Sequence, residues 1–212
     1  MLSAEEIVMQ QDGQTRAWHL VDGTGEAAVA MAAGKGPEEE WLELVRLQHR
    51  ANFELWHIED EARTPDATDT ELAGVKRRVD RTNQRRNDLA EELDRHLLGW
   101  LARQGLPNED AELNSESPGL IVDRLSILAL KIYHTREEAG RMDAPIGHAE
   151  RNRARLRILE EQRADLAGCL ESLWQETLAG TRRFKLYRQM KMYNDPSLNP
   201  AIYGKTLQRA KD

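Results

Sequence analysis

The most apolar stretch of this sequence, residues 118–134, also carries four ionisable side chains, and this combination restricts how the chain can fold. Ser117 suits an N-cap, and Pro118 suits a first helical turn because that position needs no backbone N–H. No residue from there to His134 breaks a helix. At about 100° per residue, one apolar stripe is formed by Ile121, Leu125, Leu128 and Ile132. The sequence therefore predicts a long and largely buried central helix.

A second arc of this predicted helix brings charged groups beside aliphatic side chains. Within about 100° of arc lie Asp123, Arg124, Lys131 and His134, together with Leu120 and Ile127. Buried charges need partners. The arc is thus either an internal lattice of ion pairs, the wall of a polar pocket, or a face exposed to solvent.

Composition favours an all-α protein. The chain has 212 residues, of which 40% are hydrophobic and 32% are charged, and it contains only two Phe and four Tyr. We expect a bundle of about four long helices with a C-terminal tail packed across it. The helices are predicted near residues 37–63, 69–101, 118–134 and 148–178. Residues 1–36, rich in Gly and Ala after Asp22, are expected to be a poorly ordered N-terminal segment, and residues 37–212 a single helical domain.

Charge and cysteine content exclude several classes of protein. A formal net charge of −7 argues against nucleic-acid binding driven by bulk electrostatics. The lone Cys169 excludes an internal disulfide and a multi-cysteine metal site. The sequence has no apolar run long enough to span a bilayer and no signal-peptide layout at its start, so we expect a cytoplasmic protein without a membrane partner.

Two further polar features point to a ligand. Arg86 falls at the centre of an apolar stripe, level with Val79 and Leu93, so it must meet either a carboxylate or an anionic ligand. Glu116 belongs to a short polar run directly before the central helix. Such a run is a plausible place for an anion or a hydroxylated ligand, and equally a plain capping segment.

Four blocks of this sequence resemble the bacterial domain-of-unknown-function 4254 family. The blocks are HRANFELWHIEDEAR (49–63), VKRRVDRTNQRRND (75–88), NSESPGLIVDRLSILALKIYH (114–134) and YRQMKMYNDPSLNP (187–200), so the resemblance covers roughly residues 40–203. The resemblance implies a fold group and no activity. It also implies that a set of polar residues belongs to the family pattern: His57, Glu59, Asp60, Arg63, Asn83, Gln84, Arg86, Glu116, Asp123, Arg124, Lys131 and His134.

Helix geometry allows many of these residues to meet. A hairpin of the first two long helices, turning near Asp66, would place Arg86 near Arg46 and Leu47. With the central helix against it, one cluster would contain His57, Asp60, Arg63, Arg86, Asp123, Arg124, Lys131 and His134. Its basic groups outnumber its carboxylates, which favours a phosphate or carboxylate ligand.

The leading hypothesis is a buried polar pocket for a small anionic metabolite, phosphorylated or sugar-linked, in a protein whose status as an enzyme stays open. If it is an enzyme, the catalytic candidates are His57, Asp60, Asp123 and His134, with a histidine as acid or base held by a carboxylate. Ligand binding would fall to Arg63, Arg86, Glu116, Arg124 and Lys131. No metal ligands are assigned, and the cofactor is left open.

Two alternatives remain. One is a non-catalytic accessory protein that binds another protein and uses its buried charges only as an ion-pair lattice. The other is a metal-dependent nucleotide pyrophosphohydrolase, in which Glu39, Glu40, Glu43, Glu91 and Asp94 would hold the metal. The sequence decides neither the substrate, the reaction nor the oligomeric state, and it leaves the conformation of residues 181–200 open.

Overall fold

The computed structural model describes residues 3–20, 36–190, 197–200 and 203, and within them the chain is almost entirely helical. The helices are α1 (Ala4–Leu20), α2 (Pro37–Glu61), α3 (Asp69–Ala102), α4 (Pro118–Gly140) and α5 (His148–Leu178). Two short strands, β1 (Glu112–Leu113) and β2 (Arg182–Arg183), pair in parallel. The predicted all-α bundle is confirmed, with its four long helices close to their predicted bounds.

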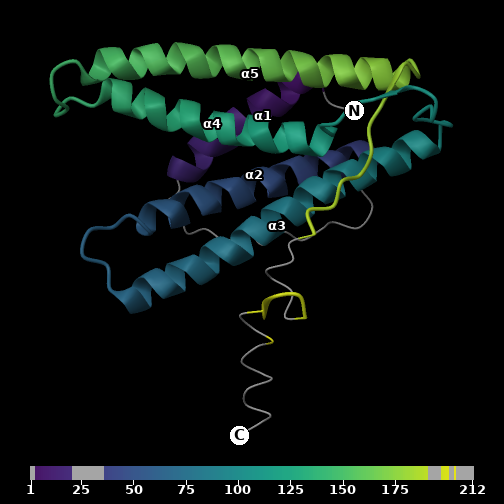
Figure 1. Ribbon diagram of the computed structural model, residues 1–212. Coiled ribbons are helices and arrows are strands. Elements are labelled where there is room, and N and C mark those ends of the chain that lie inside the picture. Colours follow the sequence, from purple (N-terminus) through teal and green to yellow (C-terminus); the bar gives the residue numbers. More distant parts are fainter. Residues whose placement is uncertain (1–2, 21–35, 191–196, 201–202, 204–212) are drawn as a thin grey trace, which may run out of the picture.

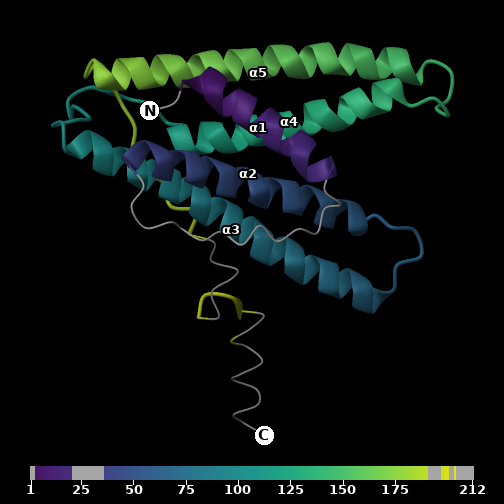
Figure 2. The same cartoon turned by 180° about the vertical axis from the view of Figure 1, so that it is seen from behind.

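The bundle consists of two helical hairpins that pack against each other through α4, with α1 lying across them. Figure 1 shows α4 beside α5 in one hairpin and α2 beside α3 in the other. Figure 2 shows α1 running obliquely across α4, from α5 towards α2. The core between them is apolar and includes the predicted stripe of α4, since Ile121, Leu125 and Ile132 are at most 2% exposed.

Helix α1 corrects the expectation that residues 1–36 are poorly ordered. Residues 4–20 form a helix whose inner face is Ile7, Gln11 and Thr15, all buried. Two of these three are polar, so the face lacks the apolar period that predicts an amphipathic helix. Gln11 is stabilised by donating a hydrogen bond to the Val122 carbonyl oxygen at 3.2 Å. Residues 21–35 lie outside the described part of the chain, and the remaining domain division stays a prediction.

The register of the α2–α3 hairpin differs from the predicted one by about two helical turns. Glu54 pairs with Arg85 and Glu61 pairs with Arg78. The physical reason is that α3 begins at the capping box of Thr68 and its first turns project, exposed, past the end of α2. Arg86 therefore lies opposite the middle of α2 and not opposite Arg46.

The start of α4 is held closely against α3. The carboxylate of Asp94, on α3, accepts hydrogen bonds from the Ser117 hydroxyl and from the Gly119 backbone N–H, the latter at 2.7 Å. Burial raises the pKa of Asp94 to about 6. A Cβ at Gly119 would lie 2.2 Å from the Ala90 carbonyl oxygen, so the contact requires glycine. Asp94 thus caps a helix other than its own.

The described part of the C-terminal tail crosses the bundle as predicted. It leaves α5 through β2, buries Phe184, and reaches α3, where the Gln189 N–H donates to a carboxylate oxygen of Glu91 at 2.9 Å (Figure 1). Residues 181–190 follow an extended path and form no helix. Residues 191–196 lie outside the described chain.

Candidate functional site

The charged arc predicted on α4 is split by the packing of the bundle. Asp123 is 7% exposed and His134 is half-buried, whereas Arg124 and Lys131 are exposed. Asp123 and His134 project within about 20° of each other on the helix, while Lys131 and Arg124 project about 80° and 100° away from Asp123. That difference carries the two basic groups out of the interface with α2 and α3. The expectation that all four would share one enclosed cluster is therefore wrong.

Glu116 and Arg124 form a pair of their own at the start of α4. Both Glu116 carboxylate oxygens lie 2.8 Å from an Arg124 guanidinium nitrogen. Glu116 lines a wide depression between α4 and α5 of about 790 Å³, together with Arg182, and not the pocket described below. This exposed pair lies apart from the other predicted site residues.

Asp123 and Arg86 join α4 to the α2–α3 hairpin. The Asp123 carboxylate accepts hydrogen bonds from the side-chain amides of Gln48 and Asn52, the latter at 2.9 Å. The Arg86 Nε lies 3.5 Å from the carboxylate and has no hydrogen-bond acceptor. Burial raises the pKa of Asp123, and the Arg86 charge opposes that rise. Arg86 therefore pairs with a carboxylate, as its position on the apolar stripe required, but the Nε of Arg86 lacks a hydrogen bond in this pair.

A pocket of about 310 Å³ opens beside this pair, between α2, α3 and α4. Three of the predicted site residues line it: Asp60, Arg63 and Arg86. Arg63 is exposed and pairs with Glu59, which also lines the pocket, at 3.1 Å. The remaining lining residues are Asn52, Leu55, Trp56, Ile127 and Leu130. The pocket therefore has an aromatic and aliphatic floor with charged groups of both signs at its mouth.

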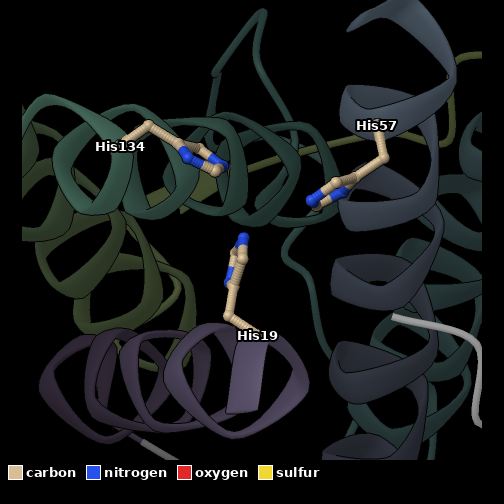
Figure 3. A group of neighbouring side chains, drawn as sticks. All are labelled: His19, His57 and His134. Carbon is tan, nitrogen blue, oxygen red and sulfur yellow. The ribbon is translucent and has the colours of Figure 1, made fainter. Parts of the chain in front are cut away.

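Three histidines meet close to Trp56, whose ring stacks on one of them. His19 from α1, His57 from α2 and His134 from α4 point towards a common space (Figure 3). Their ring centroids lie 4.9 Å apart for His19 and His134, 5.2 Å for His19 and His57, and 6.0 Å for His57 and His134. Burial lowers the pKa of His134, and the nearby His19 lowers it further. Within the described residues, this is the group of His, Cys, Asp and Glu that is able to hold a metal ion.

Sequence reasoning predicted two of these histidines and missed His19. The omission followed from setting aside residues 1–36. A usable signal was present, because each of the three follows an aromatic residue: Trp18-His19, Trp56-His57 and Tyr133-His134. Two of these aromatic side chains pack against the cluster: Trp56 stacks on His134, with centroids 4.9 Å apart and planes 8° apart, and Tyr133 stacks on His19. Trp18 stacks on His49 instead.

The acidic groups of the pyrophosphohydrolase alternative do not converge. Glu43 pairs with Arg46, Asp94 caps α4, and Glu91 accepts from the tail. Together with Glu39 and Glu40, they form no metal-holding group in the part of the chain that the structure describes. The described residues therefore give no observation in favour of this alternative.

Comparison with known proteins identifies a family. No described helix is long and apolar enough to cross a membrane. No curated protein and no solved structure matches the chain. A family model described as "Protein of unknown function (DUF4254)" matches residues 42–186, which include most of α2 and all of α3 to α5, with His57 and His134 but not His19. Since this match covers more than half of the chain, the protein belongs to the DUF4254 family.

Proposed function

We propose that the protein binds a small anionic metabolite in the pocket between α2, α3 and α4. The observation that carries the proposal is the state of Arg86. Arg86 lines the pocket, and its buried Nε lacks an acceptor because the Asp123 carboxylate stays 3.5 Å away. A planar carboxylate or a phosphate would supply the missing charge-assisted hydrogen bonds.

The dimensions and lining of the pocket restrict the ligand. A volume of about 310 Å³ lies at the lower end of the range of about 300–1,000 Å³ usual for small-molecule sites. Trp56 offers an apolar ring face, and Glu59 and Asp60 offer oxygens that accept hydrogen bonds from hydroxyls. These features favour a ligand with one anionic group and several hydroxyls, such as a sugar phosphate.

The proposal is one of binding, and turnover would require groups beyond the pocket lining. His57 and His134 are the acid–base candidates that remain; neither lines the pocket, and His134 stacks on Trp56, which does. Asp123, the other candidate, already accepts two amide hydrogen bonds and is better suited to positioning Arg86. A cytoplasmic location, expected from composition, forms part of this proposal because it would expose the pocket to phosphorylated metabolites.

The competing function is a non-catalytic accessory protein, and one observation favours it. The Asp123 carboxylate contacts Gln48, Asn52 and Arg86, all within the protein, as an ion-pair lattice that only specifies packing would require. In that case Arg86 would stabilise the fold and bind no ligand. The two functions therefore differ in what the loss of Arg86 does to ligand binding.

The test measures the binding of sugar monophosphates to metal-free protein by calorimetry, with the matching free sugars as a comparison. We expect the wild type to bind at least one phosphate better than its sugar, and Arg86→Gln to lose that preference. Arg124→Gln is the matched control, because Arg124 pairs with Glu116 away from the pocket. An absence of binding across the set, or equal losses in both variants, would leave the lattice as the better explanation.

A further inference from the structure

The three histidines come from three helices and converge on one point. His19 lies in the last turn of α1, His57 near the end of α2, and His134 in the second half of α4 (Figure 3). One ligand nitrogen from each lies within 4.8 Å of the other two. Chance pairs on a single helix are common, whereas convergence from three helices requires the tertiary fold to bring the rings together.

The hydrogen bonds of the rings fix which nitrogen is free. The Nδ1 of His19 lies 2.7 Å from the Thr15 carbonyl oxygen, and the Nδ1 of His57 lies 2.8 Å from the Phe53 carbonyl oxygen. A carbonyl oxygen only accepts, so each Nδ1 carries the proton and donates it. Each neutral ring therefore presents an Nε2 lone pair.

His134 follows the same pattern with a carboxylate as its partner. Its Nδ1 lies 3.1 Å from Oε2 of Glu137, one turn further along α4. Its Nε2, like that of His19, is buried and has no hydrogen-bond partner. A buried acceptor without a partner is unfavourable. Simple packing of three imidazoles leaves that cost in place, whereas a bound cation removes it.

The surrounding rings hold the imidazoles in orientation. The His19 ring stacks on Tyr133 at 4.2 Å between centroids, and the His134 ring stacks on Trp56. Phe53 packs against both His19 and His57 at 4.8 and 4.4 Å. Donation of the second ring nitrogen to a carbonyl or carboxylate, inside an apolar shell, is the arrangement that supports histidine ligands in metal sites.

We propose that His19, His57 and His134 bind one divalent transition metal ion, of the Zn²⁺ type, through their Nε2 atoms. Neutral imidazoles suit Zn²⁺ and its neighbours, whereas Mg²⁺ and Ca²⁺ require oxygen ligands. Zn–N bonds of about 2.0–2.1 Å place tetrahedral ligand nitrogens roughly 3.3 Å apart. Since one ring nitrogen of each histidine already lies within 4.8 Å of one from each of the others, shifts of roughly 1.5 Å close the site.

The site offers three protein ligands and therefore one open position. No fourth His, Cys, Asp or Glu of the described residues joins the group. Three protein ligands with a water in the fourth place characterise catalytic zinc sites, in which the metal lowers the pKa of that water to about 7. Glu137 stands behind His134 as a positioning residue, which fixes the ring and increases its basicity. This site does not depend on the anion pocket, and neither proposal fails with the other.

The test uses the full chain after EDTA treatment and titrates it with Zn²⁺ by calorimetry and with Co²⁺ by visible absorption. We expect one equivalent to bind, and the Co²⁺ spectrum to be that of a four-coordinate ion. The variants His19→Gln, His57→Gln and His134→Gln should each lose roughly 100-fold or more in affinity. Glu137→Gln should lose about 10- to 100-fold while the stoichiometry stays at one.

The matched control is His148→Gln. His148 is the first residue of α5, pairs with Glu138 of α4, and does not belong to the histidine cluster. The affinity of this variant should equal that of the wild type. The absence of a stoichiometric site, or an equal effect of all the His variants including the control, would overturn the proposal. If circular dichroism shows that a cluster variant does not fold, the Co²⁺ spectrum of the wild type tests the proposal instead. A spectrum like that of the hydrated ion would exclude the site.

Discussion

Replacing Gly119 with alanine should destabilise the fold, although alanine is the better helix former. Gly119 lies in the first turn of α4, where the helix backbone meets α3. An added Cβ would lie 2.2 Å from the Ala90 carbonyl oxygen and 2.9 Å from Oδ1 of Asp94. A carbon and an oxygen normally stay about 3.3 Å or more apart. The first contact is with backbone, so α4 must move away from α3 by roughly 1 Å.

The size of the effect follows from three contributions. Overpacking of this kind costs about 1–3 kcal/mol. Moving α4 also weakens the hydrogen bonds that Asp94 accepts from Ser117 and Gly119, and loss of a buried bond to a charged group costs about 1–3 kcal/mol. The higher helix propensity of alanine returns about 1 kcal/mol. We therefore expect a net loss of about 1–5 kcal/mol, or a Tm lower by about 2–20 °C for a chain of this length.

The measurement is urea unfolding followed by circular dichroism, with Gly99→Ala as the matched control. Gly99 is also helical, but it is exposed on α3 and has no atom within 4 Å of an added Cβ. That substitution should stabilise the protein by about 0.5–1 kcal/mol. The two variants should thus shift in opposite directions. A Gly119→Ala protein as stable as the wild type would refute the close contact of α3 and α4.

Two further predictions concern pH and the docking of α1. Burial lowers the pKa of His49 from 6.5 to about 3, so the stability that neutral His49 contributes is present above pH 6.5 and is lost as the pH falls towards 3. The full loss is about 5 kcal/mol, and the raised pKa of Asp94 offsets about 3 kcal/mol of it between pH 6 and 3.8. Between about pH 7 and pH 4 the two effects nearly cancel in the wild type, so its free energy of unfolding should change little, whereas His49→Gln keeps only the Asp94 effect and should gain about 3 kcal/mol of stability as the pH falls. Parallel urea-unfolding profiles for the two proteins would contradict this. Arg163→Ala should lower the free energy of unfolding by about 1–2 kcal/mol, because the two hydrogen bonds from Arg163 to Asp12 on α1 are largely buried. The control, Arg136→Ala, removes an exposed ion pair and should cost less than about 1 kcal/mol. Equal losses in thermal unfolding would show that the Arg163–Asp12 pair does not hold α1 in place.

Helix boundaries could be predicted because local chemistry determines them. Pro37, Pro118 and the capping box at Thr68 begin three of the four long helices where the sequence places them. The prediction that Arg86 pairs with an anionic group also followed from local sequence, because a guanidinium on an apolar helix face requires an anionic partner. Which carboxylate it finds depends on how α4 packs against the hairpin, and the answer, Asp123, was one of several candidates.

Three features could not be predicted because they depend on tertiary packing: helix α1, the register of the α2–α3 hairpin, and the split of the charged arc of α4. The inner face of α1 uses Gln11 and Thr15, whose burial is possible only because other helices supply hydrogen-bond partners. The hairpin register depended on how far α3 projects past α2, which neither helix encodes alone. A rotation of about 80° around α4 separates buried Asp123 from exposed Lys131, and the sequence could not show where the interface ends.

Trp56 links the two proposed sites and therefore cannot be used to distinguish them. Its ring lines the pocket and also stacks on His134. Replacing it would change the pocket wall and the packing of a metal ligand together, and any coupling between sites acts in both directions. Arg86 and His19 are the informative positions, because Arg86 lines the pocket and is no part of the histidine cluster, while His19 belongs to the cluster and does not line the pocket. A loss of anion binding confined to Arg86 variants and a loss of metal binding confined to His19 variants would establish two separate sites; a loss of both in either variant would indicate that one disturbed core explains both.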